Sequence, residues 1–212
     1  MPHERQFFRG AKVIAAQDGI RKAVGRPIEY ETYSDPNWSR AVGYWLKLAR
    51  GCADEALRDM NRDIRVMINH NSDLAVARDC PSKGISSVHH QVDENGVYIE
   101  CTPVDTVDGR DLLTKIDAGV IDGMSFGFYV SDSHWDDEHE GMPVRTVTKI
   151  SVIDDWSFVT YPKFPATSAG VKAMCGYVPD IPEELVKPPE KKNLSGQYDY
   201  YKRRFDLLGR KG

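Results

Sequence analysis

The sequence predicts an α+β domain that is mostly antiparallel β-sheet with two or three helices, followed by a linker and a tail. Short runs of β-branched and aromatic residues recur along the chain up to residue 160, separated by turn residues. Apolar residues at helical spacing are confined to a few segments. With 212 residues, 41% of them hydrophobic and 28% charged, the chain can bury a core.

The first third of the chain predicts two short strands and a long helical region. The strands lie at residues 12–16 and 27–33. Residues 34–36 (Ser-Asp-Pro) signal a helix start, with an N-cap candidate and proline at the first helical position. From there to about Met60 apolar residues recur at helical spacing, and Gly51 can divide the region into two helices.

The middle of the chain predicts strands and turns. Residues 63–70 (DIRVMINH) alternate as a strand does, and residues 71–83 read as a polar loop. Residues 86–91 and 96–103 predict a hairpin, because the Asp-Glu-Asn-Gly sequence between them is a strong turn signal. A short helix is expected at residues 110–118.

Asp108 is the expected cap of that helix and Gly119 its expected stop. The later segments are strands at residues 121–130, 144–152 and 155–160 and an acidic loop at residues 134–142. Beyond Val178 the chain is rich in proline, glutamate and lysine, which is typical of a linker. The predicted divisions are a domain at 1–174, a linker at 175–194 and a tail at 195–212, which can form a short amphipathic helix.

Composition excludes several classes of protein. The net charge of −4 does not favour nucleic acid as a partner, and no apolar run approaches the ~20 residues that span a bilayer. The N-terminus lacks the apolar core of a signal peptide. The four cysteines are widely spaced without a C-x-x-C pair, so we expect neither a metal nor a disulfide framework. We therefore expect a soluble protein of a reducing cytoplasm, without a cofactor.

The strand at residues 121–130 (IDGMSFGFYV) is the most informative stretch. Alternation places its apolar residues on one face, namely Met124, Phe126, Phe128 and Val130. Ser125 lies on the opposite face between Gly123 and Gly127, whose missing side chains would admit a substrate peptide. Such a serine suits a nucleophile that acts on polypeptide.

Acyl transfer by a serine needs a base and a group that orients the base. His70, at the end of a strand, is the best base candidate. The third group is expected from the carboxylates of Asp154 and Asp155, and Asp155 begins a run of strand-forming residues. Residue types alone make this set one hypothesis among several.

Two other interpretations of these residues are weaker. Residues 123–127 match G-x-S-x-G, but that nucleophile elbow needs a strand, a sharp turn and then a helix, whereas here a strand continues. The histidines are numerous, yet none forms H-E-x-x-H, and the Asn-His-Asn at residues 69–71 lacks the cysteines of a ββα-metal nuclease. His89 and His90 are most simply a solvated strand edge.

Four segments together resemble the capsid-maturation (prohead) proteases of tailed bacteriophages, which are distantly related to herpesvirus assemblins. These segments are residues 63–70, 108–118, 119–130 and 155–167, and they follow the order found in that family. The resemblance runs from about residue 54 to 173. It implies an assemblin-like fold, a β-barrel-like core ringed by helices, and by analogy a homodimer.

The resemblance also implies roles for individual residues. Ser125 would be the nucleophile and His70 the general base. The third position falls on Asp155, where the family more often has glutamate, and Asp154 remains a rival. Arg78 is one option for an oxyanion donor, and main-chain N–H groups near the serine are another.

The function implied is that of a serine endopeptidase of phage head assembly. Its expected substrates are the scaffold, or a scaffold-like segment of the major capsid protein, and the protease itself. It would act inside the assembling procapsid in the host cytoplasm, with no role for nucleic acid or membrane. The alternative is a catalytically silent scaffold or assembly protein on the same fold.

Overall fold

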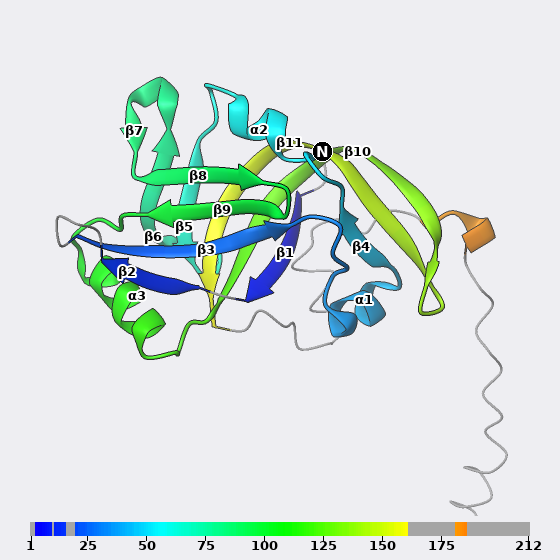
Figure 1. Cartoon of the computed structure of the whole chain (residues 1–212), viewed down its shortest axis with the longest axis horizontal. Helices are drawn as coiled ribbons and strands as arrows, with labels where there is room; N and C mark the ends of the chain where they lie inside the picture. Colours follow the sequence, from blue (N-terminus) through cyan, green and yellow to red (C-terminus); the bar gives the residue numbers. More distant parts are fainter. Residues whose placement is uncertain (1–2, 10, 16–19, 161–180, 186–212) are drawn as a thin grey trace, which may run out of the picture. The chain divides into compact units, whose positions relative to one another are not determined.

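The computed structural model describes residues 3–9, 11–15, 20–160 and 181–185, and in these residues the strands form two sheets and no closed barrel (Figure 1). The larger sheet has the order β1 (His3–Arg9), β10 (Gly123–His139), β11 (Met142–Val159), β5 (Ile64–Ile68), β6 (Asn71–Cys80) and β7 (Ile85–Ser86), with β4 (Trp45–Leu48) also paired to β11. The smaller has the order β2 (Lys12–Ala15), β3 (Arg21–Glu29), β9 (Gly96–Cys101) and β8 (Val88–Asp93). A mostly β fold is confirmed, and a ring of helices is not.

β11 is the central strand of the larger sheet. It pairs antiparallel with β10 on one side and parallel with both β5 and β4 on the other. All the other named pairings are antiparallel. Since β5 ends near residue 68 and β11 begins at 142, the parallel pair joins two distant parts of the chain.

Figure 1 shows the smaller sheet crossing the larger one, and both sheets contribute fully buried residues to the core, such as Ile99 of β9 and Phe126 of β10. As expected from alternation, Met124, Phe126 and Phe128 of β10 are fully buried. The rings of Phe126 and Phe128 are stacked with centroids 4.4 Å apart. Trp156 of β11 packs against Phe126 at 5.7 Å. The apolar face of the serine strand therefore anchors it to the core, as predicted.

The helical region expected up to Met60 is much shorter than predicted. Helix α1 (Pro36–Val42) begins as expected, with Asp35 accepting hydrogen bonds from two main-chain N–H groups. Gly43 then ends it with a left-handed φ of 87°. The next apolar residues form β4, whose Leu46 is fully buried beside β11, and α2 (Asp54–Arg58) follows. The apolar residues at 45–48 fit a helical period, but they form a buried strand between the two short helices.

The hairpin β8–β9 and the helix after it are confirmed, with one correction. Oδ1 of Asp93 accepts the N–H groups of Asn95 and Gly96 and closes the turn. Helix α3 (Val107–Asp117) is capped by Thr106 and not by Asp108, which lies in its first turn. The hydroxyl of Thr106, two residues before the expected cap, accepts the main-chain N–H of Gly109.

Two predicted loops are strands. Residues 71–83 contain β6, whose first half is polar because it is largely exposed. Residues 134–142 belong to the ends of β10 and β11, which meet in a turn where Glu140 and Gly141 have positive φ. The separate strands expected at 144–152 and 155–160 are one continuous β11.

The predicted linker and tail fall almost wholly outside the described residues. Within them only a 3₁₀ turn at Glu183–Leu185 is described, in a compact unit separate from the one that holds both sheets. No helix in the described part of the chain is long and apolar enough to cross a membrane.

Candidate active site

His70 lies in a two-residue turn between β5 and β6. Ile68 pairs with Asn71, so Asn69 and His70 are the two central residues of the hairpin. Their φ angles are 52° and 56°, and positive φ at both positions is the requirement of a type I′ turn. The turn lifts the imidazole out of the strand and over the neighbouring strands.

Three adjacent strands bring the predicted serine, histidine and aspartate together. Nε2 of His70 lies 2.7 Å from Oγ of Ser125 on β10. Nδ1 of the same ring lies 2.7 Å from Oδ1 of Asp155 on β11. An ionised carboxylate only accepts hydrogen bonds, so Nδ1–H donates to it and leaves Nε2 free to accept the serine proton. This is the arrangement that activates a hydroxyl.

The site is closed in this structure. Ser125 is 0% exposed, and the side chains of His70 and Asp155 are 4% and 3% exposed. Low exposure strengthens the hydrogen bonds that link Asp155, His70 and Ser125, because little water competes for them. A substrate carbonyl therefore reaches the hydroxyl only after some part of the surrounding chain moves.

A bulge in β11 decides between the two candidate aspartates. Gly127 pairs with Asp155, while the next residue of β10, Phe128, pairs with Ile153, so Asp154 is the extra residue. Asp154 is exposed, whereas Asp155 is 2% exposed and faces the imidazole. The structure thus brings Asp155, and not Asp154, to His70.

Arg78, the candidate oxyanion donor, is held by another group. Its Nε and Nη2 atoms donate to the two oxygens of Asp63 at 2.7 and 2.5 Å. These hydrogen bonds lower the pKa of Asp63 to about 2. Arg65, which pairs in register with both Asp155 and Arg78, also bonds to Asp63. The guanidinium of Arg78 is therefore held in a bidentate ion pair with Asp63. Arg78 lies in the same cross-strand row of residues as Arg65 and Asp155.

Gly123 and Gly127 are buried and paired on both sides. Gly123 lies between Arg9 of β1 and Val159 of β11, and Gly127 lies between Arg5 of β1 and Asp155. A peptide therefore cannot pair with the edge of β10 at these residues while β1 is in place.

The sequence predicts that His90 belongs to a solvated strand edge, and for His90 this prediction is wrong. Its Nε2 accepts a hydrogen bond from Nε1 of Trp156 at 3.0 Å, and its Nδ1 lies 3.6 Å from buried Asp79. Burial lowers its pKa to about 4, so the ring is neutral at pH 7. Arg62 also binds Asp79, at 2.6 Å. No pattern in the sequence indicates this network, because its members lie on four separate segments.

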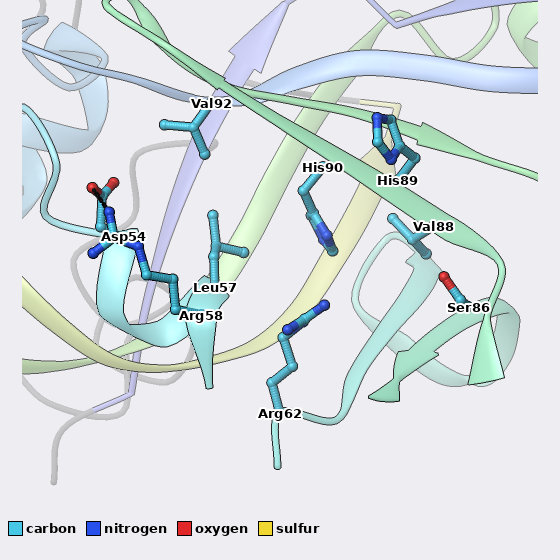
Figure 2. A pocket seen from close by; sticks show the side chains of 9 residues that line it. All are labelled: Asp54, Leu57, Arg58, Arg62, Ser86, Val88, His89, His90 and Val92. Carbon is cyan, nitrogen blue, oxygen red and sulfur yellow. Dashed lines mark hydrogen bonds and ion pairs between the residues drawn. The ribbon is translucent and has the colours of Figure 1, made fainter. Parts of the chain in front are cut away.

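A cavity of about 450 Å³ adjoins this network and not the serine. It is lined by Asp54, Leu57, Arg58, Arg62, Ser86, Val88, His89, His90 and Val92. Figure 2 shows the His90 ring and the Arg62 guanidinium pointing toward each other across it. Among the described side chains, no group of three or more His, Cys, Asp or Glu residues is gathered as a metal site would need.

The hydrogen-bonded order aspartate, histidine, serine is that of a serine-hydrolase triad. A family model described as caudovirus prohead serine protease matches residues 32–176, and the chain belongs to this family of phage capsid-maturation proteases. Among solved structures, the bacteriophage T4 capsid assembly protease, gp21, is similar, with 14% sequence identity and a TM-score of 0.46 over 74% of this chain and 99% of that chain. Comparison with curated proteins gave no match.

Proposed function

We propose that the protein is an active serine endopeptidase of phage head assembly. The observation that carries this proposal is the continuous series from Asp155 through His70 to Ser125, with both distances at 2.7 Å. Membership of the prohead serine protease family supports the reaction class. A hydroxyl, a base and a buried carboxylate in this order suit peptide hydrolysis without a cofactor.

The mechanism follows from the positions of the three groups. Oγ of Ser125 attacks the peptide carbonyl as its proton passes to Nε2 of His70. The imidazolium then gives that proton to the leaving amine, and an acyl-enzyme forms. Asp155 stabilises the imidazolium through Nδ1–H. Water, deprotonated by His70, attacks the acyl group and releases the second product.

The oxyanion donor is a choice between Arg78 and main-chain N–H groups near Ser125. Arg78 could donate only after leaving Asp63, which holds it through two hydrogen bonds. This pairing favours the main chain. Loss of one oxyanion donor typically lowers kcat by about 10²- to 10³-fold. The kcat of Arg78→Ala should therefore fall by this factor only if Arg78 donates to the oxyanion.

We propose that the substrates are the scaffold, or a scaffold-like segment of the major capsid protein, and the protease itself, inside the procapsid in the host cell. The family description supports a role in the prohead. A buried serine also suits an enzyme that is inactive until assembly opens it, because early proteolysis would destroy the shell's building blocks.

Co-expression with the capsid protein and scaffold of the same phage tests this function. Wild type should shorten one of these chains, and Ser125→Ala and His70→Ala should leave both intact. The double variant should lose little more than either single variant, because triad residues act as a unit. Unchanged cleavage by Ser125→Ala would refute the proposal.

A catalytically silent assembly protein is the second candidate, and the complete burial of Ser125 favours it. Mass spectrometry of the purified chain distinguishes the two. An active protease should trim itself, and residues 178–200, in the predicted linker and tail, are the expected place. An intact chain, even after incubation with the capsid protein, would favour the silent protein.

A further inference from the structure

The hydroxyl of Ser157 touches both supports of the candidate triad. It donates to Oδ1 of Asp155 at 2.6 Å, and this is the same oxygen that accepts from the His70 ring. Its oxygen also accepts the main-chain N–H of His70 at 3.1 Å. Ser157 is 0% exposed, so both hydrogen bonds are shielded from water.

The position of Ser157 in the sheet explains how one hydroxyl reaches both groups. On β11 it pairs with Ser125 of β10 on one side and with Met67 of β5 on the other. It lies two residues beyond Asp155, so alternation places both side chains on the same face. Ser157 therefore lies between the strand of the nucleophile and the turn of the base.

His70 needs such a support because its backbone is unfavourable. A φ of 56° is left-handed, a region that residues other than glycine occupy at a cost, although asparagine, aspartate and histidine are found there more often than most. The preceding residue, Asn69, is held by reciprocal side-chain bonds to Thr160 of 3.3 and 3.0 Å. His70 is thus tied to β11 through Ser157, and Asn69 is tied to Thr160, the residue that follows β11.

We infer that Ser157 is a positioning residue for this reaction, an inference that rests on the proposed function. It fixes the Asp155 carboxylate toward Nδ1 and fixes the main chain of His70 so that the ring spans from Asp155 to Ser125. Ser157 does not touch the reacting atoms. It acts through the other two residues, and its loss leaves the nucleophile in place with a poorly oriented base.

Phosphonylation of Ser125 by a small fluorophosphonate measures this role without a known peptide substrate. The Oγ–P bond forms as the P–F bond breaks, fluoride leaves, and the serine proton passes to His70. Saturation kinetics separate the maximal rate, kinact, from the half-saturating concentration, KI. We expect Ser157→Ala to lower kinact by about 10- to 100-fold, because misorientation by about 1 Å costs that much, with KI unchanged.

Two further variants complete the experiment. Ser151 lies on the same strand, but its hydroxyl donates to the Tyr129 carbonyl. The Ser151→Ala variant should therefore react with the probe at the wild-type rate. Ser157→Cys keeps the shape of the side chain, with a slightly larger atom in place of the oxygen, but replaces a strong donor with a weak one. It should show the same loss of kinact, and it serves as the test if Ser157→Ala does not fold.

The outcomes separate this inference from the function beneath it. If the probe labels wild type at Ser125, and Ser157→Ala or Ser157→Cys reacts at the wild-type rate, the positioning role of Ser157 is overturned and the proposed function is not. A rise in KI with kinact unchanged would assign Ser157 to probe binding and also overturn it. A wild type that the probe does not label at Ser125, even when it is assembled with the capsid protein and scaffold, would overturn both the proposed function and the inference.

Discussion

At the scale of single residues, His70 combines an unfavourable backbone with a buried ring. A left-handed conformation costs about 1–2 kcal/mol for an ordinary side chain. Here it is the second central residue of a tight turn, where that conformation is required. The hydrogen bonds that His70 makes to Ser157, Asp155 and Ser125 offset this cost.

His90 makes stability depend on pH. Its folded-state pKa of about 4 lies below the ordinary 6.5, because burial disfavours the charged ring in spite of nearby Asp79, while Arg62 and His89 add to the lowering. Between pH 6.5 and about 4 the unfolded chain binds a proton that the folded chain does not. Stability therefore falls as pH falls through this window, by up to about 3 kcal/mol, and is unaffected above it.

Denaturant unfolding at several pH values checks this prediction. His90→Gln, whose amide oxygen can still accept from Trp156, should give a flatter dependence on pH than wild type between 6.5 and 4. His89→Gln is the matched control on the same strand, since His89 is exposed. Parallel curves for wild type and His90→Gln would contradict the assignment.

Sequence reasoning selected Ser125 and His70 as candidates because their chemistry and their places in or beside strands are local properties, and the structure brings the two side chains within 2.7 Å. It left Asp154 and Asp155 open because the bulge that separates them depends on how β11 pairs with β10. An extra residue in a strand changes which side chain faces the site, and a single strand's sequence does not reveal its partner's register. Ser157 lies within one of the segments that resemble the family, but its two hydrogen bonds are visible only in the assembled sheet.

At the scale of elements, the turn at Asn69 and His70 had a signal that was missed. Asparagine between two β segments is typical of a two-residue hairpin, although glycine usually follows it. Because the residues after His70 are polar, the sequence predicts a loop where the structure has β6. Its exposed first half explains the error, since the pattern that marks a strand needs one buried face.

Replacement of Asn69 tests the turn. Asn69→Ala should lower the free energy of unfolding by about 1–2 kcal/mol, because alanine resists positive φ and loses both bonds to Thr160. Asn69→Gly loses the same bonds but adopts the conformation freely, so it should cost less. Chemical denaturation of both variants gives the comparison, and equal losses would show that the positive φ contributes little to the cost.

At the scale of the whole β domain, the two sheets approach closely where β3 crosses β10. A Cβ atom on Gly25 would lie 2.5 Å from Sδ of Met124, the residue before the candidate nucleophile. Neither the crossing nor the parallel pairing of β5 with β11 could be predicted, because both join segments far apart in the chain. Local patterns specify strands well and their partners poorly.

Gly25→Ala should therefore destabilise the domain by about 1–3 kcal/mol, the usual cost of overpacking a core. Met124 is fully buried and has little room to move aside. In a chain that already carries Met124→Ala, the same substitution should cost less, because the clashing atom is gone. Melting temperatures of the two single variants and the double variant measure this coupling, and strict additivity would contradict the contact.

The central place of β11 also governs when the site can exist during synthesis. His70 and Ser125 are 55 residues apart, and His70 and Asp155 are 85 apart, so the ribosome delivers the aspartate last. Until β11 has emerged, β10 and β5 have no shared neighbour to hold them together. A nascent chain thus carries its serine and histidine without a means to join them. The hydroxyl meets its base only when nearly all of the sheet has been made.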